Sequence, residues 1–110
     1  MNDLDRIEID INEAKEVIGV LEALKRLENN DDFKKVITEG YFVQEASRLV
    51  LIKADPNLAE DGSQKTINNS IIAVGQFRQY LSSVYQLGGI AQRSIIAGEE
   101  AREEILSEEE

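Results

Sequence analysis

The N-terminal segment of the chain carries apolar side chains separated alternately by three and four positions, which are Leu4, Ile7, Ile11, Ala14, Ile18 and Leu21. This spacing is the a/d pattern of a helix that packs along one stripe. Asn2 or Asp3 is expected to cap the helix and Asn29-Asn30 to end it, because Asn and Asp favour caps and turns. Gly19 costs a helix about 1 kcal/mol relative to Ala, so we expect it to mark a close helix crossing.

Two short helices are predicted in the middle of the chain. Asp31-Asp32 is expected to cap the first, because carboxylates suit the positive end of a helix. Gly40 is expected to end it, since glycine commonly follows the last helical residue. The second helix is expected from Tyr41 to about Lys53. The β-prone residues 49–52 leave a short strand as the alternative, but no partner strand is evident nearby.

A loop over Lys53–Gly62 precedes the last helical segment, because Pro56 disfavours helix at the residue before it. We predict a second long helix from Ser63 to Leu106. Gly88-Gly89 would break, kink or merely weaken this helix. Its apolar stripe is Ile67, Ile71, Val74, Phe77, Leu81, Val84, Ala91 and Ile95.

These elements predict an all-α fold, a small helical bundle with two long antiparallel helices and two short middle helices. We expect a single helical domain over residues 1–106 and a frayed acidic tail over 107–110. Phe42 and Phe77 are the expected hydrophobic centre. A monomer of 110 residues buries only about two-thirds of its unfolded surface, so self-association would stabilise it.

The amino-acid composition excludes most of the common catalytic mechanisms. The chain has no His, Cys or Trp, so it has no disulfide, no thiolate metal site and no Ser-His-Asp triad. We therefore expect no enzymatic activity, no catalytic residues, no cofactor and no metal. The acidic first residues do not fit a signal peptide, and no apolar run is long enough to span a membrane. We expect a soluble intracellular protein that does not bind membranes.

Charge is segregated along the sequence. The formal net charge of −10 divides into −6 over residues 1–32, −1 over 33–62, +3 over 63–98 and −6 over 99–110. Such acidity disfavours direct binding of nucleic acid. The segment 63–98 has no carboxylate, and uncharged polar side chains tolerate burial at an interface. The protein-interface residues that we predict are Gln76, Arg78, Gln79, Ser83, Gln86 and Arg93.

The same segment has a second interpretation. It would lie centrally in its own bundle, with Arg78 and Arg93 facing carboxylates of the first helix or of the tail. The acid-free composition would then serve packing within one chain rather than contact between chains.

Two blocks of the sequence resemble small acidic helical proteins of tailed bacteriophages. They are N-D-D-F-K-K-V-I-T-E-G-Y-F-V-Q-E-A-S-R-L-V over Asn30–Val50 and I-A-V-G-Q-F-R-Q-Y-L over Ile72–Leu81. The resemblance covers about half of the chain, includes no catalytic signature and transfers no site residues. It implies a phage context, in the host cytoplasm or in the virion, and a part in virion assembly.

Two functions follow as hypotheses. The first is a non-catalytic structural or assembly protein, a component or assembly factor of a phage particle, whose partners are copies of itself or phage structural proteins. The alternative is an acidic inhibitor that blocks a nucleic-acid-binding site on a host protein, since the Glu-rich end would mimic phosphates.

Overall fold

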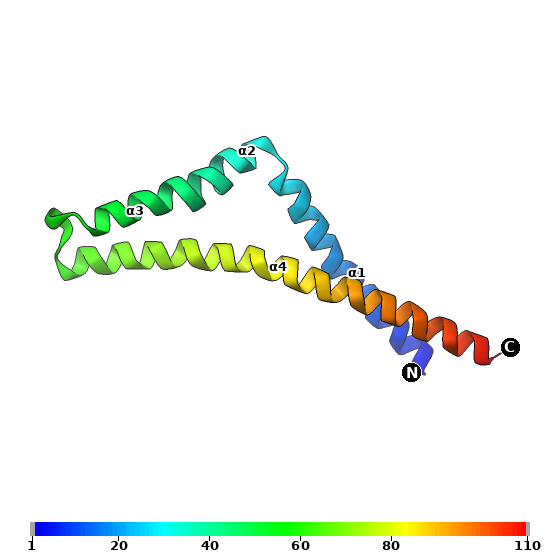
Figure 1. Ribbon diagram of the computed structural model, residues 1–110. Coiled ribbons are helices and arrows are strands. Elements are labelled where there is room, and N and C mark those ends of the chain that lie inside the picture. The colour runs from blue at the N-terminus through cyan, green and yellow to red at the C-terminus, as the bar shows by residue number, and fades with distance from the viewer. Residues whose placement is uncertain (1, 110) are drawn as a thin grey trace. The chain divides into compact units, whose positions relative to one another are not determined.

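A computed structural model describes residues 2–109, and these residues contain helices and no strand (Figure 1). The elements in chain order are α1 (Asp3–Glu28), α2 (Asp31–Phe33), the π-helix η1 (Lys34–Glu45), α3 (Ala46–Lys53), the 3-10 helix η2 (Pro56–Leu58) and α4 (Asp61–Glu108). The predicted all-α class is confirmed. Residues 49–52, where a strand was the alternative, lie within α3.

Contacts within the chain group its residues into two compact units. Unit 1 joins residues 1–24 to residues 83–110, and unit 2 comprises residues 25–82. The single domain expected over residues 1–106 stays a prediction. The fraying expected over 107–110 also stays a prediction: α4 continues to Glu108, and residue 110 lies outside the described part.

The start of α1 is capped by a side chain. Asn2 Oδ1 accepts a hydrogen bond from the backbone N–H of Asp5 at 2.8 Å, and Asp5 Oδ2 accepts one from the backbone N–H of Asn2 at 3.4 Å. This reciprocal arrangement satisfies N–H groups that have no partner inside the helix. Asn2, one of the two residues predicted as the cap, is therefore the cap. The helix ends just before the predicted turn at Asn29-Asn30.

Unit 1 brings the first part of α1 against the last part of α4 through two glycines of α4. A Cβ atom at Gly88 would lie 2.4 Å from Leu21 Cδ2, and one at Gly98 would lie 2.9 Å from Ile11 Cγ1. Carbon atoms without a bond between them optimally lie about 3.5–4.0 Å apart, so no larger residue fits without movement. The side chains of Ile11, Leu21 and the α4 residue Ala91 are buried here.

The predicted role of Gly19 is wrong. A Cβ atom at Gly19 would meet nothing within 4 Å, so this glycine marks no crossing. Gly88-Gly89 does not break α4, which is continuous from Asp61 to Glu108. Gly88 serves instead as the point of close approach to α1, because its missing side chain makes room for Leu21.

The middle of the chain is one unbroken helical segment from Asp31 to Lys53. Its cap is Asn30, whose Oδ1 accepts a hydrogen bond from the backbone N–H of Phe33 at 2.9 Å, so the predicted Asp31-Asp32 cap is wrong. The predicted end at Gly40, and with it the pair of short middle helices, is also wrong. Gly40 lies inside η1 with no positive φ, and therefore does not form a helix-ending cap.

Part of this segment, η1 over Lys34–Glu45, is a π-helix. A π-helix bonds each amide to the carbonyl five residues earlier. Half-buried side chains recur along the segment, among them Phe33, Ile37, Tyr41 and Glu45. A Cβ atom at Gly40 would lie 2.8 Å from the carbonyl oxygen of Lys35.

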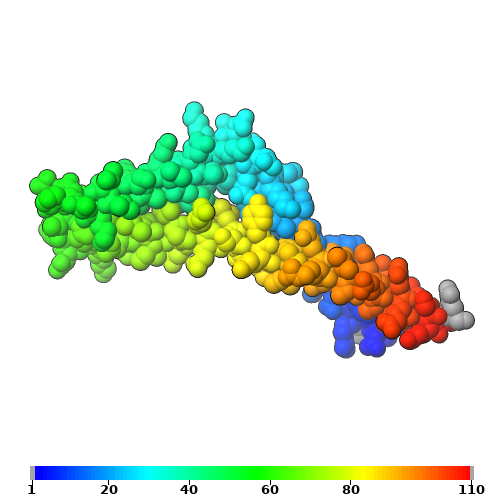
Figure 2. Space-filling model, viewed as in Figure 1, coloured from blue at the N-terminus to red at the C-terminus, as the bar shows by residue number. Residues whose placement is uncertain are grey.

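Unit 2 packs this middle segment against the first part of α4 around three aromatic rings. The ring centroids of Phe42 and Phe77 lie 5.3 Å apart, and those of Tyr41 and Phe77 lie 6.0 Å apart. Phe42 and Phe77 meet as predicted, although both stay half-buried. The buried apolar side chains of unit 2 are Leu49, Ile67 and Val74. Figure 2 shows the side chains of the two segments meeting along their length.

The turn between α3 and α4 is held by side-chain hydrogen bonds. Asp55 Oδ1 accepts from the backbone N–H of Asn57 at 2.9 Å, which caps the short helix η2 inside the segment that was predicted as a loop. Gln64 Nε2 donates to the carbonyl oxygen of Leu58 at 2.8 Å, and Lys53 Nζ donates to Asn68 Oδ1 at 2.5 Å. α4 begins at Asp61 rather than at the predicted Ser63, since a carboxylate is stabilised in the first turn.

Candidate functional site

Large apolar side chains are exposed over much of this molecule. Among the described residues no side chain is fully buried, and those with a large exposed apolar group are Ile9, Val17, Val20, Leu27, Val36, Val43, Val50, Leu51, Ile72, Tyr80, Tyr85, Leu87, Ile90, Ile96 and Leu106. Single exposed apolar residues are ordinary, but contiguous ones mark surfaces that bind other molecules. The candidate sites are therefore the places where these side chains gather.

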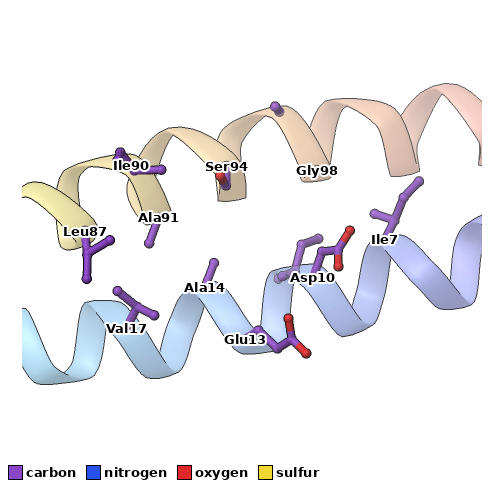
Figure 3. A pocket seen from close by; sticks show the side chains of 12 residues that line it. Ile7, Asp10, Glu13, Ala14, Val17, Leu87, Ile90, Ala91, Ser94 and Gly98 are labelled. Carbon is purple, nitrogen blue, oxygen red and sulfur yellow. The ribbon is translucent and has the colours of Figure 1, made fainter.

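One such place is a groove in unit 1 between α1 and α4, with a volume of about 490 Å³. We call it the unit 1 groove. Its lining residues are Ile7, Asp10, Ile11, Glu13, Ala14, Val17, Leu87, Ile90, Ala91, Ser94, Ala97 and Gly98. In Figure 3, Val17 and Leu87 lie at one end of the groove and Ile7 and Gly98 at the other.

The unit 1 groove is open because two helices bury only their facing stripes. Ala14 and Ala91 form its floor and are buried, whereas Val17, Leu87 and Ile90 are 36%, 56% and 51% exposed. The α4 side of the groove carries the small residues Ala91, Ser94, Ala97 and Gly98. The arrangement therefore presents an apolar surface that one chain does not cover by itself.

The two walls of the unit 1 groove differ in charge. The α1 wall carries the carboxylates of Asp10 and Glu13, which Figure 3 shows beside the apolar residues. The α4 wall has no carboxylate, and Arg93 lies among its residues in the sequence. Within the described part of the chain, neither Asp10, Glu13 nor Arg93 forms an ion pair. The predicted pairing of Arg93 with a carboxylate is therefore not found there.

A second apolar surface lies on the middle segment in unit 2. We call it the middle face, and it is lined by Phe42, Val43, Ala46, Ser47, Val50 and Leu51. Leu51 is 73% exposed. At the edge of this segment Arg48 donates hydrogen bonds to both carboxylate oxygens of Glu45, which lowers the pKa of Glu45 and raises that of Arg48.

Three of the six predicted interface residues come together. Gln76, Arg78 and Gln79 are exposed and line one shallow hollow on the first part of α4, together with Ile72, Gly75 and Ser82. The guanidinium of Arg78 lies 5.8 Å from the centroid of the Phe42 ring, so its contact is a cation–π interaction rather than the ion pair considered from sequence.

The other three predicted interface residues belong to unit 1. Gln86 and Arg93 are exposed, and Ser83 is half-buried. The sequence pattern did not predict the unit 1 groove, because Val17, Leu87 and Ile90 only broaden the apolar stripes of the two long helices in that pattern. A usable signal was their position beside the buried stripe rather than on it.

The described residues also bear on metal binding and on membrane crossing. Within residues 2–109 no three Asp or Glu side chains converge as metal ligands would. In the same residues no helix combines the length and the apolar character that a membrane crossing requires.

Comparison with protein-family models, curated proteins and solved structures finds no match. The phage context expected from the sequence therefore stays a prediction, and function has to be argued from the surfaces described above.

Proposed function

We propose that this chain is a non-catalytic structural or assembly protein that acts by binding other protein subunits through exposed apolar faces. The observation that carries the proposal is the gathering of exposed apolar side chains into the unit 1 groove and the middle face. Removal of such apolar surface from water by a partner contributes favourably to the free energy of binding. A highly acidic protein keeps such a surface soluble until the partner arrives.

The proposal includes the finer architecture expected from sequence, in which the two long helices pack antiparallel as a scaffold. The support is that Leu21 lies at Gly88 while Ile11 lies at Gly98, so the residue numbers rise along α1 as they fall along α4. Such a scaffold presents one continuous groove rather than a deep pocket, which suits a helix better than a small molecule.

The phage resemblance extends this proposal to a phage particle, either as a component or as an assembly factor. Its partners would then be copies of itself or phage structural proteins. Mass spectrometry of purified particles and of assembly intermediates tests this extension. Finding the chain in neither would contradict it without touching the more general proposal.

The decisive experiment measures association of the full chain. We expect light scattering to give a mass above that of one chain at high concentration, or binding to purified virion proteins by sedimentation. Substituting Val50→Ser and Leu51→Ser removes the middle face, and Leu87→Ser with Ile90→Ser removes the unit 1 groove. A strictly monomeric chain that binds no structural protein, and whose behaviour neither pair of substitutions alters, would overturn the proposal.

A further inference from the structure

No third helix of unit 1 covers the unit 1 groove among the described residues. These residues form two helical segments, 2–24 and 83–109. The facing stripes of the two segments already pack against each other, where Leu21 and Ile11 contact glycines of α4. The remaining apolar residues of the groove, Val17, Leu87 and Ile90, point to solvent. A helical partner laid along the groove would bury them at once.

We infer that the partner is unit 1 of a second copy of this chain, so that two copies form a four-helix bundle groove to groove. The inference rests on the proposed function and names the partner of that site. It is argued from charge complementarity between the two walls of the groove.

The acidic wall and the acid-free wall match each other across two copies. In an isologous contact the same patch meets itself, so residue i touches j and residue j touches i. With α1 of one copy beside α4 of the other, Asp10 and Glu13 face a wall without carboxylates, and Arg93 lies on the same stretch of α4 without lining the groove. With α1 beside α1, the same carboxylates would face their own counterparts, and like charges across an interface are costly.

Helical spacing places Arg93 correctly for this contact. Gln86, Ile90, Arg93 and Ala97 are separated by four, three and four residues, so they share the flank of α4 that borders the groove. Ile90 and Ala97 line the groove itself. Arg93 therefore lies at the rim, where a charge sets the pairing and stays partly hydrated, and the apolar groups lie at the centre.

The first test compares two matched isoleucines of α4 in the full chain. Ile90 lines the groove and is 51% exposed, whereas Ile96 is 59% exposed and does not line it. Sedimentation velocity should show two chains for the natural protein. Ile90→Asp should raise the dimer dissociation constant by about tenfold or more, as loss of a central apolar contact does. Ile96→Asp should change it little, and circular dichroism should show both variants helical.

The second test exchanges charges across the contact. Arg93→Glu should weaken the dimer by about tenfold at low salt, and Glu13→Arg combined with Arg93→Glu should restore it. Restored dimerisation requires the two residues to face each other between copies. This test therefore remains informative if the Ile90→Asp variant fails to fold.

Three outcomes would overturn the inference: a monomer at every concentration, equal effects of Ile90→Asp and Ile96→Asp, or no restoration by the exchanged charges. If a monomeric chain binds a different protein and Ile90→Asp abolishes that binding, this inference fails and the proposed function stands. If the monomer binds no protein at all, both fail.

Discussion

At the scale of single residues, glycine has opposite roles at different positions of the same fold. Gly88 faces Leu21 so closely that a Cβ atom would lie 2.4 Å from Leu21 Cδ2 and 2.8 Å from its Cβ. Leu21 is buried and has little freedom to move away. We expect Gly88→Ala to reduce the free energy of unfolding by about 1–3 kcal/mol, the usual cost of overpacking, measured by chemical denaturation.

The matched control is Gly19→Ala in the same unit. A Cβ atom there meets nothing within 4 Å, so only the helix propensity changes. The substitution should raise the free energy of unfolding by about 0.5–1 kcal/mol. If both substitutions change the free energy of unfolding in the same direction, the result contradicts a close approach of α4 to Leu21.

The cap of the middle segment offers a second residue-scale test. Asn30 Oδ1 accepts from the backbone N–H of Phe33 at 2.9 Å. Asn30→Ala should cost about 1 kcal/mol of stability, whereas Asn30→Asp, which keeps the acceptor, should cost little. Thermal denaturation followed by circular dichroism measures both. No loss of stability in Asn30→Ala would contradict the capping role of Asn30.

At the scale of elements, part of the local chemistry of caps and turns was predictable and the tertiary roles of glycine were not. The cap at Asn2, the turn at Pro56 and the end of α1 near Asn29 follow from neighbours in sequence, whereas the cap of the middle segment is Asn30 and not Asp31-Asp32. The place of Gly40 does not follow in this way, because a glycine without a positive φ continues a helix instead of ending it. The predicted two middle helices failed for this reason.

The position of the helix crossing was readable in principle. Val84, Ala91 and Ile95 belong to the predicted apolar stripe of the last segment, and Gly88 and Gly98 continue its spacing of four and three residues. Gly19 is off the stripe of its own helix. Of the candidate site, Gln76, Arg78 and Gln79 lie together in one hollow, and their role at an interface stays a prediction. The unit 1 groove depends on which face the partner helix leaves open, which one sequence does not specify.

The π-helix gives an element-scale prediction. A Cβ atom at Gly40 would lie 2.8 Å from the carbonyl oxygen of Lys35, so Gly40→Ala should be incompatible with the present geometry. We expect a loss of about 1–3 kcal/mol or a shift of the segment to α-helical hydrogen bonds. NMR couplings measured across hydrogen bonds would show whether the amide of residue 40 still donates to the carbonyl group five residues earlier.

Gly75→Ala is the control for this change. It lies in the regular helix α4 and its Cβ atom would meet nothing within 4 Å, so the same substitution should stabilise the protein slightly. Retention of the π-helix in Gly40→Ala at unchanged stability would refute the steric explanation.

At the scale of the whole molecule, the acidic C-terminal end separates the two functional hypotheses. Glu103, Glu104, Glu108 and Glu109 are all exposed. Replacing them by Gln should leave self-association unchanged or slightly tighter, because binding through apolar faces does not need these charges and repulsion falls. The dissociation constant at low and high salt measures this. An inhibitor that mimics phosphates would instead lose its partner, and that result would favour the alternative.

The shallow burial of this fold has a consequence for how it unfolds. Because only nine apolar side chains of the described residues are buried, unfolding of an isolated chain exposes less new apolar surface than unfolding of a well-packed protein of the same length. The heat capacity change and the denaturant m-value should both be small for a chain of this length. Amide protons along α1 and α4 should then exchange quickly with solvent in the free chain and slowly in the assembled one, since a ligand of the native state adds its binding free energy to the protection.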